Sequence, residues 1–142
     1  MRAVGIILAG GNSNKMRELT HKRAVAAMPI AGSYRAIDFA LSNMSNSHIQ
    51  KVAVLTQYNA RSLNEHLNSS KWWDFGRKQG GLYVFTPTIT AENGYWYRGT
   101  ADAIYQNLDF LKRCHEPYVI ITSGDAVYKM DYSKVLQYHI DK

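Results

Sequence analysis

The sequence predicts an α/β domain built around a mostly parallel β-sheet, and three observations lead to that prediction. Short apolar runs rich in β-branched residues alternate along the chain with segments of helical periodicity. Two of these runs end directly in glycine-containing turns. The composition is that of a globular domain, with 142 residues of which 46% are hydrophobic and 20% charged. Alternating strands and helices imply parallel strands joined by right-handed crossovers.

Two strands and two helices are predicted in the first half of the chain. Residues 4–8 form a continuous apolar run that ends at Ala9-Gly10-Gly11, which is typical of a central strand covered on both faces. In residues 37–46 apolar side chains recur at helical spacing, and Asp38 can stabilise the first turn. Residues 51–56 are predicted to form a second buried strand, followed by a short helix at 60–67.

Residues 69–81 are polar, aromatic and glycine-rich without a period, so we expect a loop there, followed by a strand at 82–86. Thr100 is expected to cap the clearest helix of the chain, which runs to about residue 111 with one apolar stripe. No repeat or low-complexity tract interrupts this pattern.

The last predicted elements are a strand at 118–122, which ends in Ser123-Gly124-Asp125, and a helix at 132–140 that Asp131 can cap. Because no closing strand follows this helix, we expect residues 1–142 to be the N-terminal portion of a larger domain.

The net charge and the single cysteine limit which ligands and which cellular location are expected. The net charge of +6 favours anionic partners, but the basic residues are scattered apart from one cluster between Lys15 and Arg23. A nucleic-acid binder more often has a longer basic stripe, so we expect small anions as ligands and no nucleic acid. The lone Cys114 cannot form an internal disulfide, and no apolar run is long enough to span a bilayer. We therefore expect a cytoplasmic protein without a membrane partner.

Two predicted loops point to one ligand site. The turns at Gly10-Gly11 and at 123–125 both follow strands, and ligands of open α/β sheets bind beyond the carboxyl ends of the strands. Glycines there let backbone N–H groups approach phosphate oxygens, and Asp125 offers the hard oxygen ligand that Mg²⁺ prefers. The first turn matches neither the dinucleotide fingerprint nor a Walker A loop. A plain tight turn and a capping or surface aspartate remain the alternatives.

Further candidates lie before the helix at Thr100. Gly99, Thr100 and Asp102 sit at a helix N-terminus, which suits phosphate or substrate hydroxyls, although ordinary capping explains them equally well. Packing under a loop is the expected role of the aromatic residues Trp72, Trp73, Trp96 and Tyr97, with base or sugar stacking as the alternative. The five histidines show no metal-ligand spacing.

Taken together, several long blocks resemble the ADP-glucose pyrophosphorylase (glucose-1-phosphate adenylyltransferase) family. The matching blocks are AGG at 9–11, MRELTHKRAVAAMPIAGSYRAIDFALSN at 16–43, VLTQYNARSLNEHL at 54–67, WYRGTADAIYQN at 96–107 and SGDAVYKMDY at 123–132. The resemblance implies a Rossmann-like nucleotidyltransferase fold. It also implies an enzyme that converts ATP and glucose 1-phosphate to ADP-glucose and pyrophosphate in glycogen synthesis. The family adds further strands and a C-terminal left-handed β-helix, and it assembles as a tetramer.

The resemblance also implies roles for particular residues. Asp125 matches the Mg²⁺-binding catalytic aspartate, and Lys15 takes the place of a catalytic arginine. The positions implied to bind nucleotide are Leu8, Gly10, Gly11, Gln57, Gly99 and Thr100. Those implied to contact the sugar phosphate or to serve regulation are Arg35, Trp96, Tyr97 and Asp102.

Three departures from the family pattern bear on activity. Lys15 and Met16 stand where the active pattern has arginine and leucine, and Val25 stands where it has a phosphate-facing lysine. Ala126 replaces the histidine that commonly follows the metal aspartate. Because nucleotidyl transfer depends on cations that stabilise phosphate charge, we expect a weakly active or inactive GlgD-type regulatory subunit that pairs with a catalytic subunit. The alternatives are a fully active enzyme, in which Lys22 or Arg23 replaces the missing lysine, and a nucleic-acid-binding module suggested only by net charge.

Overall fold

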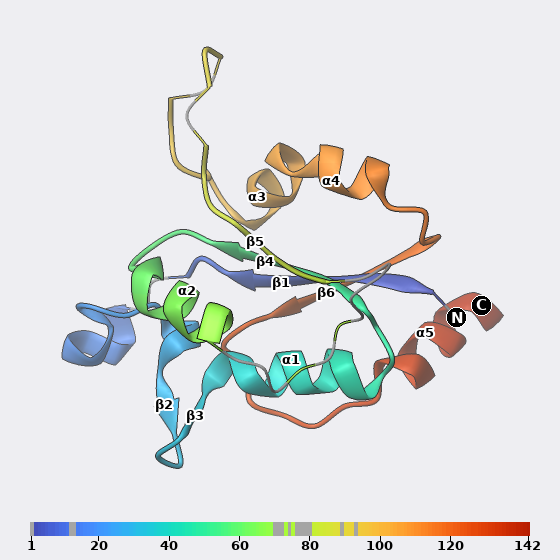
Figure 1. Cartoon of the computed structure of the whole chain (residues 1–142), viewed down its shortest axis with the longest axis horizontal. Coiled ribbons are helices and arrows are strands. Elements are labelled where there is room, and N and C mark those ends of the chain that lie inside the picture. The colour runs from blue at the N-terminus through green and yellow to red at the C-terminus, as the bar shows by residue number, and fades with distance from the viewer. Residues whose placement is uncertain are drawn as a thin grey trace.

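A four-stranded, entirely parallel sheet forms the centre of the computed structural model, which describes residues 2–11, 14–69, 73, 75, 81–88, 90–92 and 94–142. Its strands lie in the order β5-β4-β1-β6 (Figure 1). Their bounds are Ala3–Ala9 for β1, Lys51–Thr56 for β4, Gly81–Phe85 for β5 and Tyr118–Ser123 for β6. The four predicted strands are confirmed, and so is the α/β fold class.

The apolar run of the first strand is buried because β4 and β6 pair with both edges of β1 and helices cover both faces of the sheet (Figure 1). Val4 and Ile7 are 0% exposed, and Ile7 is paired with Val54 on one side and Thr122 on the other. At Gly5 an added Cβ would lie 2.7 Å from the Met44 sulfur, so the absence of a side chain lets the neighbouring helix approach the strand closely. The central strand is thus enclosed on both faces, as its sequence predicts.

Helices cover both faces of the sheet (Figure 1). One face carries α1, at Ala36–Asn46, and α5, at Tyr132–Asp141, while α3 and α4 lie on the other. Ile37, Leu41 and Met44 of α1 are 0% exposed, which explains the helical spacing of apolar residues there. None of the described helices combines the length and the apolar character that crossing a bilayer requires.

Two predicted helix starts are confirmed by hydrogen bonds. Asp38 accepts a hydrogen bond of 2.9 Å from the backbone N–H of Arg35 at the start of α1. At the start of α5, Asp131 accepts one of 3.0 Å from the backbone N–H of Ser133. In each case a carboxylate satisfies a donor that the first helical turn leaves unpaired.

The helix predicted from Thr100 to residue 111 is divided in two. It consists of α3 at Thr100–Gln106 and α4 at Leu108–Arg113, with the break at Asn107. The Asn107 amide donates hydrogen bonds to the Ala103 carbonyl at 2.8 Å and the Tyr97 hydroxyl at 3.0 Å, so the side chain competes with the backbone of the helix. The expectation that Thr100 is the N-cap is also wrong, because Gly99 holds that position and Thr100 is the first helical residue.

Short elements between β1 and α1 escaped the sequence prediction. They are the 3-10 helices η1 at Asn14–Thr20 and η2 at Val25–Ala27, and a hairpin of β2, Pro29–Ile30, with β3, Tyr34–Arg35. The hairpin turn has φ values of 51° at Ala31 and 87° at Gly32, a conformation in which glycine is favoured. Two-residue strands are too short to show a period of their own.

The loop predicted at 69–81 falls largely outside the described residues. Within it, Ser69 ends α2, which spans Ala60–Ser69, and Gly81 begins β5. Trp73 donates a hydrogen bond of 3.2 Å to the Ser42 hydroxyl, and Phe75 is buried. Packing rather than stacking on a ligand is therefore the role of Trp73, whereas Trp72 lies outside the described part of the chain.

A half-buried ion pair joins β4 to the segment before β6, and it should make stability depend on pH. Lys51 Nζ lies 3.2 Å from Glu116 Oε2. Burial alone would raise the pKa of Glu116, but hydrogen bonds and the charge of Lys51 lower this pKa below its ordinary value of 4.5. The stabilisation is therefore present above that value and lost as the pH falls through the lower, folded-state pKa.

We expect urea unfolding to show that Glu116→Gln lowers the free energy of unfolding at neutral pH, and that the difference from wild type shrinks below pH 4.5. Arg61→Ala, which breaks an exposed pair with Glu65, is the control and should have little effect at any pH. A Glu116→Gln difference that does not change with pH would contradict the assignment.

Candidate functional site

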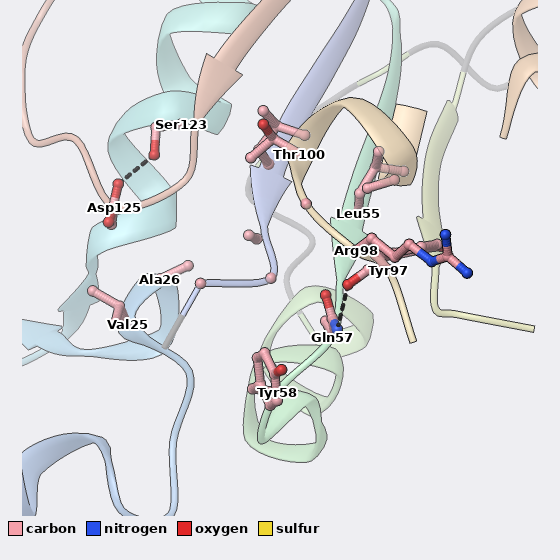
Figure 2. Close-up of a pocket in the computed structure, with 16 residues that line it drawn as sticks. Val25, Ala26, Leu55, Gln57, Tyr58, Tyr97, Arg98, Thr100, Ser123 and Asp125 are labelled. Carbon is pink, nitrogen blue, oxygen red and sulfur yellow. Dashed lines mark hydrogen bonds between the residues drawn. The ribbon is translucent and has the colours of Figure 1, made fainter. Parts of the chain in front are cut away.

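An open cleft of about 720 Å³ lies at the carboxyl ends of β1, β4 and β6 (Figure 2). Its lining comes from five separate parts of the sequence, namely Leu8, Ala9, Gly10, Gly11, Val25, Ala26, Leu55, Gln57, Tyr58, Tyr97, Arg98, Gly99, Thr100, Ala103, Ser123 and Asp125. Both glycine-containing turns singled out in the sequence therefore border the same cleft. This location is the one expected for a ligand in an open α/β sheet.

The turn after β1 exposes backbone to the cleft. An added Cβ at Gly10 would lie 3.1 Å from Cβ of Gln57, so a side chain there would press against the end of β4. At Gly11 no atom lies within 4 Å of the added Cβ, so this position opens into free space. Without side chains, the backbone of both residues is accessible to a ligand, which is what close approach of phosphate oxygens requires.

Asp125 is an exposed carboxylate on the segment after β6, and it accepts a hydrogen bond from the hydroxyl of Ser123 (Figure 2). The residue between them, Gly124, is buried and donates its N–H to the Leu8 carbonyl at 2.9 Å. A Cβ at Gly124 would meet the Cβ atoms of Ala9 at 3.2 Å and Ala26 at 3.3 Å. A side chain at position 124 would therefore crowd Ala9 and Ala26, and glycine lets the Asp125 segment approach the glycine turn without that crowding.

The wall beside Asp125 is aliphatic. Val25 and Ala26 of η2 lie next to it, whereas Gln57, Tyr97 and Arg98 lie on the opposite side (Figure 2). Of the lining residues only Asp125 and Arg98 carry a charge, and the Arg98 side chain points away from Asp125. Lys22 and Arg23 lie shortly before η2 but are exposed and outside the lining. Among the residues that the structure describes, no cation lines the side of the cleft that holds Asp125.

The opposite wall is fixed by hydrogen bonds. The Gln57 amide donates to the Tyr97 carbonyl at 3.3 Å (Figure 2), and the Tyr97 hydroxyl accepts from Asn107 at 3.0 Å. Burial raises the pKa of Tyr97, and the nearby charge of Asp102 adds to this, although the Asn107 hydrogen bond opposes it. Tyr97 as a residue is only 8% exposed, and it packs as a neutral phenol.

Comparison with known proteins places the chain in a protein family. Residues 4–142 match the nucleotidyl transferase family. The chain belongs to that family. It is 48% identical over 139 residues to a glucose-1-phosphate adenylyltransferase of Clostridium novyi and 49% identical over 139 residues to one of Clostridium beijerinckii, covering 98% of this chain and 36% of each relative. A glucose-1-phosphate adenylyltransferase of Thermosipho africanus is 48% identical over 136 residues, which cover 96% of this chain and 33% of that protein. The chain thus spans about a third of the length of the curated relatives it matches.

Most residues singled out from the sequence line this cleft. They are Leu8, Gly10, Gly11, Gln57, Tyr97, Gly99, Thr100 and Asp125, together with Val25. Tyr58 and Arg98 also line it but were not singled out. Their positions in the sequence could have identified them, because Tyr58 directly follows Gln57 and Arg98 directly precedes Gly99.

Two predicted site residues bind other parts of the protein. Arg35 donates from Nη1 to both the carbonyl and the hydroxyl of Ser62 at 2.9 Å, so it joins β3 to α2. Asp102 accepts hydrogen bonds of 2.9 Å from the backbone N–H of Arg98 and from Gln106. Asp102 therefore stabilises the start of α3, as expected for the capping role that the sequence left open as an alternative.

Two others are absent from the lining of the cleft. Lys15 is exposed on η1. Trp96 is 57% exposed and stacks on Tyr58, with 5.4 Å between ring centroids and 15° between planes. Since Tyr58 itself lines the cleft, the pair extends the cleft into an exposed aromatic surface. Packing under a loop therefore does not describe Trp96.

Asp125 can hold Mg²⁺ only if a bound ligand supplies further oxygen atoms to the metal. Among the described residues there is no group of three or more His, Cys, Asp or Glu side chains arranged to hold a metal. Mg²⁺ is commonly bound through one or two carboxylates together with substrate phosphates and water. An exposed carboxylate beside an open glycine turn meets that requirement.

The remaining candidates for acid–base or nucleophilic chemistry lie elsewhere. The Cys114 thiol donates to the Phe110 carbonyl at 3.2 Å, and burial raises its pKa, which favours the unreactive protonated form. His66 Nε2 lies 2.6 Å from Asp38 Oδ1, so it joins α2 to α1. Neither residue lines the cleft.

Proposed function

We propose that this chain forms the nucleotide-binding part of a glucose-1-phosphate adenylyltransferase, which converts ATP and glucose 1-phosphate to ADP-glucose and pyrophosphate in glycogen synthesis. The names of relatives that match nearly the whole chain at 48–49% identity support the substrates. The glycine turn, the single carboxylate and the polar groups of the opposite wall support a nucleotide in the cleft. The lone, half-buried Cys114 favours the reducing environment of the cytoplasm.

In this proposal each wall of the cleft has a separate task. The backbone of Gly10 and Gly11 approaches the phosphates, and Asp125 holds Mg²⁺ together with their oxygens. When bound, Mg²⁺ neutralises charge that develops on the phosphate oxygens. Gln57 and Thr100, on the opposite wall, offer an amide and a hydroxyl to the base or sugar.

We further propose that the protein is a weakly active or inactive GlgD-type regulatory subunit, which joins a catalytic subunit in a hetero-tetramer. The observation that carries this proposal is the aliphatic side chain of Val25 in the cleft beside Asp125 (Figure 2). Nucleotidyl transfer is accelerated mainly by positioning and by cations placed against phosphate oxygens. Lys22 and Arg23, which could supply such a charge, are exposed and outside the lining.

A fully active adenylyltransferase is the second candidate. The identity to proteins named as the enzyme favours it, and Lys15 preserves a positive charge shortly after the glycine turn. A lysine lacks the bidentate hydrogen-bonding fork of arginine, so this substitution weakens phosphate binding without removing it.

Steady-state assays of the full-length protein, alone and mixed with its catalytic partner, distinguish the two candidates. We expect little ADP-glucose from the protein alone and altered kinetics of the partner in the mixture. Equilibrium titration with ATP should nevertheless show binding to the protein alone. Rapid ADP-glucose synthesis by the protein alone would reject the regulatory role, and absence of ATP binding would reject the nucleotide site.

A further inference from the structure

The cleft carboxylate lies on a segment that has no regular structure of its own. Eight residues, 124–131, join the end of β6 to the start of α5, and Asp125 is the second of them. Among the described residues, Ser123, two positions earlier, donates a hydrogen bond to the Asp125 carboxylate, and Asp125 is exposed. Packing around the carboxylate therefore does not fix its position, which must come from the way its backbone is held.

The first anchor of this segment is Gly124. Its N–H is bonded to the Leu8 carbonyl at 2.9 Å, and its Cα packs so tightly that an added Cβ would lie 3.2 Å from both Ile7 Cγ2 and Ala9 Cβ. The residue directly before Asp125 is thus fixed to β1.

The second anchor is a buried amide of α1, which runs alongside the segment in Figure 1. Asn43, only 4% exposed, donates from Nδ2 to the Tyr128 carbonyl at 3.0 Å and accepts at Oδ1 from the Met130 N–H at 3.1 Å. Reversing the amide would place like groups against each other, so only one orientation satisfies both partners. The Tyr128 hydroxyl is also held, at 2.9 Å from Thr122 Oγ1.

From these contacts we infer that Asn43 is a positioning residue for Asp125, acting through the backbone of the 124–131 segment. The inference rests on the proposed function, in which Asp125 binds Mg²⁺ with a nucleotide. Only residues 125–127 lie between the two anchors, so loss of the second anchor frees the carboxylate to move relative to the glycine turn. Asn43 is not among the residues that line the cleft, so its effect on the metal is indirect.

Ser47, one helical turn after Asn43, provides a matched control. Its hydroxyl, also buried at 7% residue exposure, accepts the Tyr132 N–H at 2.8 Å. This bond comes from the C-cap of the same helix and is made to the residue that directly follows the 124–131 segment, so it holds the start of α5 instead of the segment around Asp125. Removing it should destabilise the fold without releasing the carboxylate.

The test measures Mn²⁺ binding to the full-length protein in the presence of ATP, by the electron paramagnetic resonance signal of free Mn²⁺. We expect Asn43→Ala to raise the Mn²⁺ dissociation constant about 10-fold or more, and Ser47→Ala to leave it nearly unchanged. Urea unfolding of both variants shows whether they lose similar stability. If Asn43→Ala does not fold, Asn43→Ser, which keeps a polar atom but cannot span both partners, takes its place.

Equal Mn²⁺ affinities of the Asn43 and Ser47 variants would overturn the inference. The Asn43 side chain would then contribute only to the free energy of unfolding and not to the position of Asp125. Asp125→Asn separates this failure from failure of the proposed function. If Asp125→Asn weakens Mn²⁺ binding and the Asn43 variant does not, only the positioning role is wrong. If Asp125→Asn leaves Mn²⁺ binding unchanged, the metal site is wrong and the inference falls with it.

Discussion

Replacing Val25 with lysine in the full-length protein is expected to raise kcat for ADP-glucose synthesis by about 10²–10³-fold, equivalent to about 3–4 kcal/mol of transition-state stabilisation. The new ammonium group would enter the cleft beside Asp125 and close to the glycine turn, on the side where no described cation lines the cleft. Charge that develops on phosphate oxygens would then meet a fixed positive partner. Comparison of kcat and KM in the absence of a catalytic partner checks the prediction.

Val25→Leu is the matched control, because it enlarges the side chain without adding charge. We expect it to leave kcat close to that of the wild type. If the lysine and leucine variants behave alike, the missing cation does not limit turnover and the regulatory role loses its physical basis. In that case, Lys22→Ala and Arg23→Ala in the wild-type protein would show which existing cation serves the phosphates.

Truncating the centre of the main core should have an effect of similar size on stability. Leu41 of α1 is 0% exposed and lies in the apolar cluster under the sheet, with Ile7, Ile37 and Met44. We expect Leu41→Ala to lower the free energy of unfolding by about 2–5 kcal/mol, because it removes buried methyl groups and leaves a cavity. Urea unfolding followed by circular dichroism measures the change.

Leu19→Ala is the comparison for the core prediction. Leu19 lies on η1 and is 61% exposed, so its truncation should change the free energy of unfolding by no more than about 0.5 kcal/mol. A loss of stability in Leu19→Ala as large as in Leu41→Ala would mean that η1 is covered in the full-length protein.

The strands and the main helix faces could be predicted from the sequence because each has a strong local pattern. The apolar run of β1 is typical of a strand buried on both faces, and the strand is indeed between two others. Asp38 and Asp131 were expected to stabilise helix starts, and the hydrogen bonds they accept are made within three residues of the chain. Such features depend on contacts between residues that are neighbours in the sequence.

Features that depend on distant residues could not be predicted in this way. The helix after Gly99 breaks at Asn107, whose side chain bonds both to the helix carbonyl of Ala103 and to the hydroxyl of Tyr97, ten positions earlier. Arg35 matches a functional motif, but its guanidinium is bonded to Ser62, 27 positions later. Asn43 has no motif that points to the Asp125 segment, which lies more than 80 positions away in the sequence.

By itself the sequence determined the α/β class, the positions of the four sheet strands and the two turns that meet at one edge of the sheet, because periodicity and glycine placement express local backbone preferences. Only the tertiary structure decided which side chains share the cleft and which bind other parts of the protein. The aliphatic wall at Val25, the approach allowed by Gly124 and the hydrogen bonds of Asn43 depend on distances between segments that are far apart in the chain. Those distances are set by packing of the whole core.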